Sequence, residues 1–262
     1  MRRLFLALVL ISAPAFASTY DDFSRGIDAN NRGDTGTAIE AFTRSIDGGD
    51  LAPSYLPSAH FGRARALLHD RRCDVARADL TDAITLRPDF VDAYSLLAEA
   101  DACLGRDDAA LADATAAVRL RPAAGYYFTR TRMLWNVGQF DAALADAELA
   151  VGRDPGNAYF ALWQAMIALR TGKQVAVMVA ADDDWPKPLL DLYAGRASIE
   201  HVRRAAGTNA AYKCEADFYI GEWTLARGKS DAGRSLIEIA ARECPSDYIA
   251  AQAARRELAR RP

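Results

Sequence analysis

The sequence predicts an all-α protein, a right-handed superhelical solenoid of helix-turn-helix pairs. The main observation is a recurring pattern of an Ala, a small residue seven positions later and a Pro twelve positions later, with Ala steps of 34 and 33 residues. It occurs three times: Ala76, Ala83 and Pro88; Ala110, Ala117 and Pro122; and Ala143, Ala150 and Pro155. The composition agrees, because 51% of the residues are hydrophobic and many are Ala, which suits closely packed helices better than a broad sheet.

The spacing of the pattern also divides the chain. Residues 18–172 hold about four helix pairs and the first helix of a fifth. Residues 173–213 lose the pattern and are expected to form an irregular helical segment, with a short helix from Ser198 to Ala206. Residues 214–262 restore it as a last pair followed by a capping helix. That helix carries four arginines: Arg255, Arg256, Arg260 and Arg261. We interpret them as a solvated face near a helix C-terminus, with an acidic partner as the alternative.

Residues 1–17 have the features of a secretory signal peptide. They begin with Arg2 and Arg3, continue through an apolar run and end in Ala-Phe-Ala, so cleavage is expected after Ala17. The apolar run is too short to span a bilayer, and no later stretch approaches about 20 apolar residues. We therefore expect a soluble protein that is periplasmic or otherwise exported and does not span a membrane.

The net charge of the chain limits the classes of partner that it is expected to bind. Cleavage of the signal removes two of the 32 basic residues and none of the 35 acidic ones, which leaves a formal charge of −5. Net acidity argues against general binding to nucleic acid or to anionic membranes. We therefore expect the partners to be proteins or peptides.

Four cysteines are present, and in an exported protein they can form lasting disulfides. Cys214 and Cys244 are 30 residues apart and would lie at the same end of the last helix pair. Cys73 and Cys103 have the same spacing and would lie on one edge of the stack. We expect both bridges; the alternative is four buried thiols that act as small apolar side chains.

Few residues suggest catalysis or metal binding. The spacing of His60 and His69 does not match the close pair of a zinc-protease helix, and the third histidine is His201. The sequence has no nucleophile elbow, phosphate-binding glycine loop or Cys-x-x-Cys pair. The run Asp182–Asp184 lacks the alternating oxygens and glycine turn of a calcium loop. We therefore expect no catalytic residues, no metal and no cofactor, and do not expect an enzyme.

A helical array offers a different functional surface, the concave face lined by the first helix of each pair. Phe61 and Phe128 occupy the same repeat position, and Arg65 and Arg132 each lie one helical turn later. Such pairs suit an extended or helical peptide that carries apolar side chains and carboxylates. The expected partner-binding residues are Phe61, Arg65, His69, Glu99, Phe128, Arg132, Trp135, Met166 and Arg170. The alternative is that the rings belong to the core between repeats and the arginines are solvated charges.

The pattern resembles tetratricopeptide repeats across nearly the whole mature chain. Two longer strings, W-P-x-P-L-L-x-L-Y-x-G at 185–195 and C-E-A-x-F-Y-x-G-E at 214–222, resemble the periplasmic lipoprotein NlpI group. This resemblance implies a dimeric scaffold that binds peptidoglycan hydrolases and a tail-specific protease. The chain departs from the group because its first cysteine is Cys73, so no lipid anchor is expected and the group's partners do not transfer directly.

Together these features predict a non-catalytic periplasmic scaffold that holds protein partners in its groove. It would act by raising the effective concentration of one partner near another. One alternative is a secretion or assembly chaperone that shields extended client segments. Another is a hydrolase whose site the sequence does not reveal.

Overall fold

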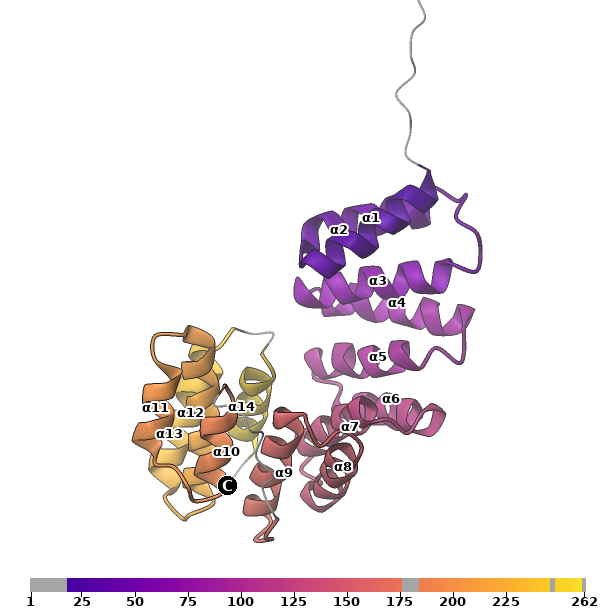
Figure 1. Ribbon diagram of the computed structural model, residues 1–262. Helices are drawn as coiled ribbons and strands as arrows, with labels where there is room; N and C mark the ends of the chain where they lie inside the picture. Colours follow the sequence, from indigo (N-terminus) through magenta and orange to yellow (C-terminus); the bar gives the residue numbers. More distant parts are fainter. Residues whose placement is uncertain (1–17, 176–183, 246–247, 261–262) are drawn as a thin grey trace, which may run out of the picture.

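The computed structural model describes residues 18–175, 184–245 and 248–260, and in these ranges the chain consists of helices and their connections, without a strand (Figure 1). The all-α repeat architecture predicted from the sequence is therefore confirmed. The expected signal peptide at 1–17 lies outside the described residues, as do Asp182 and Asp183. None of the described helices is both long enough and apolar enough to cross a bilayer.

The first eight helices form four consecutive pairs. They are α1 (Thr19–Arg32) with α2 (Thr35–Asp47), α3 (Leu56–His69) with α4 (Cys73–Leu86), α5 (Val91–Cys103) with α6 (Asp107–Leu120), and α7 (Ala124–Asn136) with α8 (Phe140–Arg153). A ninth helix, α9 (Ala158–Arg170), follows and packs on α8. The opening helices of the pairs also contact one another, α1 with α3, α3 with α5 and α5 with α7, so they form one layer, here termed the first-helix layer.

Small residues at the helix crossings allow these pairs to pack closely. The alanines of the repeated pattern are completely buried: Ala76, Ala83, Ala110, Ala117, Ala143 and Ala150. At Gly62 in α3 the approach is closer still, since a Cβ atom there would lie 2.4 Å from Cζ of the Phe42 ring. Gly138, in the turn between α7 and α8, has a φ of +77°, which glycine adopts without steric cost. The period in the sequence therefore marks crossings that need small side chains.

Ion pairs tie the two helices of some pairs together. Arg63 of α3 binds both carboxylate oxygens of Asp79 of α4, at 2.7 and 2.8 Å. Arg130 of α7 binds Asp146 of α8 in the same way, at 2.6 and 2.8 Å. Each Asp lies three residues after a repeat Ala and sixteen after its Arg. Asp113 has the same repeat position but a leucine sixteen residues before it, and burial raises its pKa to about 6.

The remaining helices turn back toward the array. α10 (Lys187–Tyr193) packs on α9, and α11 (Ile199–Ala206) packs on α10 and on α12 (Ala210–Leu225). α12 forms the last regular pair with α13 (Ser230–Glu243). α14 (Ile249–Ala259) packs on both and also contacts α7. Figure 1 shows this last helix between the C-terminal helices and the array.

Two disulfides link helices at the edges of the structure. Cys73 at the start of α4 is bonded to Cys103 at the end of α5, with Cα atoms 6.2 Å apart. Cys214 in α12 is bonded to Cys244, directly after α13, with Cα atoms 5.2 Å apart. These are the two pairs that the sequence spacing indicates.

The double variant Cys214→Ala with Cys244→Ala is expected to lose about 3.5 kcal/mol of unfolding free energy, because the bridge closes a 30-residue loop in the unfolded chain. Urea unfolding followed by circular dichroism measures this difference. Thiol titration of the denatured wild type without reductant should detect no free thiol. Four free thiols, or a variant as stable as the oxidised wild type, would contradict the assignment.

Candidate protein-binding groove

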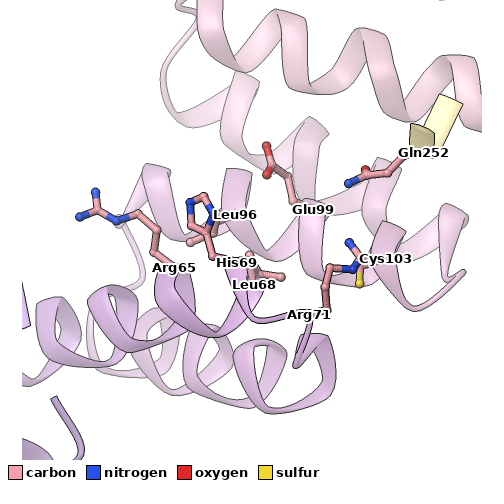
Figure 2. A pocket seen from close by; sticks show the side chains of 8 residues that line it. All are labelled: Arg65, Leu68, His69, Arg71, Leu96, Glu99, Cys103 and Gln252. Carbon is pink, nitrogen blue, oxygen red and sulfur yellow. The ribbon is translucent and has the colours of Figure 1, made fainter. Parts of the chain in front are cut away.

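A hollow of about 140 Å³ lies on the first-helix layer and is lined mainly by α3, α5 and α14; it is termed the α3–α5 hollow below. Figure 2 shows Arg65 and His69 of α3, Glu99 of α5 and Gln252 of α14 around it. Leu68 and Leu96 add apolar surface, and Arg71 and the disulfide-bonded Cys103 complete the wall. The structure thus brings together Arg65, His69 and Glu99 from the expected partner-binding set.

Arg65 and Arg71 give the α3–α5 hollow positive charge, and the acidic residue of its lining, Glu99, is already paired with Arg132. Within the described ranges, the side chains of Arg65, His69 and Arg71 make no ion pair or hydrogen bond. Arg255 of α14 lies with Arg71 on an adjoining hollow, and burial, together with the charge of Arg71, lowers the pKa of Arg255. A surface of this kind attracts carboxylates, which guanidinium groups bind with two parallel hydrogen bonds.

Three other residues of the expected set are enclosed. Trp135 and Met166 are 0% and 1% exposed. Arg132 is buried, and its guanidinium donates a hydrogen bond of 2.6 Å to Glu99. The expected binding face is therefore open at Arg65 and His69 of α3 and closed at Arg132, Trp135 and Met166.

Two arginines, Arg256 of α14 and Arg260 directly after it, contact this part of the array. Arg260 lies 5.0 Å from the centroid of the Trp135 ring and donates a hydrogen bond to the Trp135 carbonyl oxygen. Arg256 donates to the carbonyl oxygen of Ala102 at 2.8 Å and is paired with Asp107 at 2.8 Å. The interpretation of these two side chains as a solvated face is wrong. Both carbonyls lie in the last turns of α5 and α7, where each accepts a hydrogen bond from the N–H of a turn glycine, Gly105 or Gly138, and one from the arginine as a second donor.

Arg170, the last of the expected residues, lies at the centre of an ion-pair network. It binds Glu222 of α12 at 2.8 Å and Glu257 of α14 at 2.7 Å, and Glu257 is also paired with Arg260. Burial, followed by the nearby charge of Glu257, raises the pKa of Glu222 to about 8, although Arg170 opposes this shift. The network joins three helices from distant parts of the chain.

The two aromatic residues of the expected set contribute to packing between repeats. The Phe61 ring centroid is 5.0 Å from that of Phe90 in the next repeat. Phe128 lies 4.7 Å from Phe160 and 5.8 Å from Trp163. Phe61 and Phe128 are nevertheless half-buried rather than enclosed, so one part of each ring stays accessible to a ligand.

A second hollow, of about 420 Å³, lies between α7, α9, α12 and the start of α14, and is termed the aromatic pocket. Its side chains include Phe128, Tyr159, Trp163, Tyr212, Glu215, Tyr219 and Tyr248. Of these residues, only Phe128 belongs to the expected partner-binding set. Tyr159 and Trp163 are four residues apart, and Tyr212, Glu215 and Tyr219 follow helical spacing too, but only the fold sets these two helix faces opposite each other.

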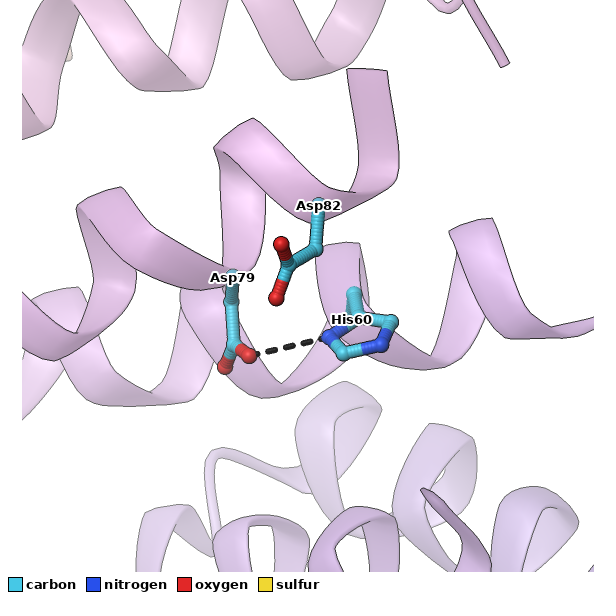
Figure 3. A group of neighbouring side chains, drawn as sticks. All are labelled: His60, Asp79 and Asp82. Atoms are coloured by element: carbon cyan, nitrogen blue, oxygen red, sulfur yellow. Dashed lines mark hydrogen bonds and ion pairs between the residues drawn. The ribbon is translucent and has the colours of Figure 1, made fainter. Parts of the chain in front are cut away.

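One cluster has the residue types of a metal site. His60, Asp79 and Asp82 bring ligand atoms within 4.8 Å of one another, and His60 Nδ1 lies 3.0 Å from Asp79 (Figure 3). Arg63, however, occupies both oxygens of Asp79. Burial alone would raise the pKa of Asp79, but the hydrogen bonds from Arg63 and His60 lower it overall. The ion pair between α3 and α4 therefore accounts for this cluster without a metal ion.

The fold and this surface define a helical-repeat protein of the protein-interaction class. The family model for the tetratricopeptide repeat matches residues 61–125 and 132–176. These two stretches therefore carry tetratricopeptide repeats, and the observed helix pairs extend the same architecture along the array. No curated protein matches the sequence.

Solved structures with the same fold cover most of the chain. A tetratricopeptide repeat protein from Parabacteroides merdae has a TM-score of 0.59 at 13% identity, covering 92% of this chain and 98% of that one. The tetratricopeptide protein TTC0263 from Thermus thermophilus has a TM-score of 0.54 at 16% identity, with coverage of 78% and 99%. A MamA protein has a TM-score of 0.52 at 16% identity, with coverage of 73% and 95%. These likenesses establish the fold.

The pKa of Glu222 predicts a pH dependence of stability. Because its pKa in the folded state lies above the ordinary value of 4.5, the folded protein retains a proton that the unfolded chain releases. The contribution of Glu222 to stability therefore falls as pH rises between 4.5 and about 8. Glu222→Gln removes this titration, so its melting temperature should fall less between pH 5 and pH 8.

Thermal melts of both proteins across this range measure the effect. Glu238→Gln is the matched control, since Glu238 is exposed on α13 and should leave the wild-type pH profile unchanged. Parallel profiles for the wild type and Glu222→Gln would contradict the buried, proton-retaining state of Glu222.

Proposed function

We propose that this chain is a non-catalytic scaffold or adaptor of the periplasm, and that it binds a carboxylate-bearing segment of a partner protein at the α3–α5 hollow. The observation that carries the proposal is the group of unpaired basic side chains, Arg65, His69 and Arg71, on the first-helix layer of a tetratricopeptide-repeat protein. A carboxylate is the complementary group, because charge-assisted hydrogen bonds to guanidinium are about twice as strong as neutral ones.

The surroundings of the hollow define the shape of the ligand. Leu68 and Leu96 provide apolar surface beside the charges, and the half-buried Phe61 lies on the same helix as Arg65. Gln252 of α14 bounds the hollow on another side. This geometry favours an extended segment that lies across α3 and α5 and places an Asp, a Glu or its C-terminal carboxylate against the basic group.

Other features of the chain support the proposed location and the proposed class of partner. The N-terminal signal features and the two disulfides suit an oxidising compartment outside the cytoplasm. The resemblance to the NlpI group favours cell-envelope enzymes, such as peptidoglycan hydrolases or a tail-specific protease, and a homodimer. Holding two such partners on one chain raises the effective concentration of each for the other.

The double variant Arg65→Glu with His69→Glu should weaken partner binding at least about tenfold, because it places two negative charges where the carboxylate binds. Partners are first captured by crosslinking in an envelope extract, identified by mass spectrometry and purified. Their affinity for the wild type and the variant is then measured by calorimetry at two salt concentrations. The wild-type affinity should fall with added salt.

Arg119→Glu is the matched control, because Arg119 is exposed on α6, outside the first-helix layer. It should bind like the wild type. Equal affinity of the wild type and the double variant for every purified partner would overturn the proposed groove. Capture of unfolded clients instead of folded enzymes would favour the chaperone alternative.

A further inference from the structure

The aromatic pocket differs from the α3–α5 hollow in its chemistry. It has about three times the volume, and its walls come mainly from aromatic rings on α7, α9 and α12 and at the start of α14. Tyr159 and Tyr212 are 37% and 36% exposed, whereas Trp163 and Tyr219 are buried behind them. The two hollows have no lining residue in common. The aromatic pocket therefore needs its own explanation.

A single carboxylate, Glu215, stands among these rings. Trp185 Nε1 donates a hydrogen bond of 2.6 Å to its Oε2, and the Tyr159 hydroxyl donates to the same oxygen at 3.0 Å. Both donors are neutral. Within the described part of the chain, no Lys or Arg is paired with Glu215. These hydrogen bonds stabilise the half-buried carboxylate but leave its charge without a counter-charge, and burial raises its pKa, so a nearby cation would stabilise the ionised form.

The rings are held in place around this carboxylate. Trp185 stacks on Tyr212 with centroids 4.7 Å apart and an angle of 11° between the planes. Trp163 meets the Phe128 ring nearly at right angles, at 5.8 Å. The faces of aromatic rings carry negative potential and attract cations, most strongly where water is partly excluded. Rings fixed by one another present these faces without reorganisation on binding.

We propose that the aromatic pocket binds an alkylammonium group, with Glu215 as the counter-charge and the tyrosine and tryptophan rings as walls. A carboxylate ligand would be repelled by Glu215, and a neutral hydrocarbon would leave Glu215 without a counter-charge. The guanidinium of Arg132 lies 5.7 Å from the Phe128 ring, but it is already paired with Glu99 and does not serve as the counter-charge of Glu215. The group can come from a free quaternary amine or from a lysine of a bound protein, which share this chemistry.

The test titrates the full mature chain with three probes and follows tryptophan fluorescence, to which Trp163 and Trp185 at the pocket contribute together with Trp135 and Trp223. The probes are choline, the blocked peptide acetyl-Gly-Gly-Lys-Gly-Gly-amide, and the same peptide with norleucine in place of lysine. At least one cationic probe should give a saturable change, and the norleucine peptide should bind at least tenfold more weakly. Choline binding alone indicates a free amine, and binding of the lysine peptide indicates a protein side chain.

Glu215→Gln should weaken the binding of the cationic probe at least tenfold, since the amide oxygen can still accept the two hydrogen bonds but carries no charge. Glu148→Gln, on the exposed face of α8, is the matched control and should bind like the wild type. Thermal melts verify that each variant is folded, and Tyr212→Leu provides a second variant if Glu215→Gln is not. Equal binding of the norleucine peptide, no saturable change with either cation, or unchanged binding by both variants would overturn the proposal.

Discussion

The ion-pair network around Arg170 is the contact on which the arrangement of the chain depends. A single guanidinium on α9 binds Glu222 of α12 and Glu257 of α14, so it fastens two C-terminal helices to the array. Removing one partner from such a buried network leaves an uncompensated charge, at a cost of about 3–5 kcal/mol. Because α14 is held in this position, Arg256 and Arg260 reach the last-turn carbonyls of α5 and α7.

The position of α14 divides the inner surface into two sites of opposite charge preference. Gln252 of α14 bounds the basic α3–α5 hollow, whereas Tyr248 and the first residues of α14 line the aromatic pocket with its carboxylate. A tetratricopeptide array without this helix would present one continuous groove. The two binding proposals together imply a partner, or two partners, with both an acidic and a basic determinant.

The sequence predicted those features that depend on local spacing. Ala110 and Ala117 mark the helix crossing of one repeat, and the alanines one period away mark those of its neighbours, so these pairs follow from the period alone. The return of α14 could not be predicted, because Arg256 and Arg260 look the same in sequence whether they meet water or distant helix ends. The aromatic pocket could not be predicted for a similar reason. Its residues lie on four helices, on both sides of the segment where the repeat pattern is lost. The sequence also did not distinguish an accessible Arg65 from an Arg132 already bound to Glu99.

The contacts of α14 favour a fixed element over a removable lid. Its departure would expose the Trp135 ring, which is 0% exposed and packs against Arg260. Phe140 and Trp163 also pack on this ring, so only part of its area would be exposed, at a cost below the roughly 5 kcal/mol of a fully buried large aromatic side chain. The departure would also break the pairing of Arg170 with Glu257 and leave the carbonyls of α5 and α7 without these donors. A ligand that displaced α14 would have to replace all of these interactions, so the contacts favour two separate hollows over one groove that opens on binding.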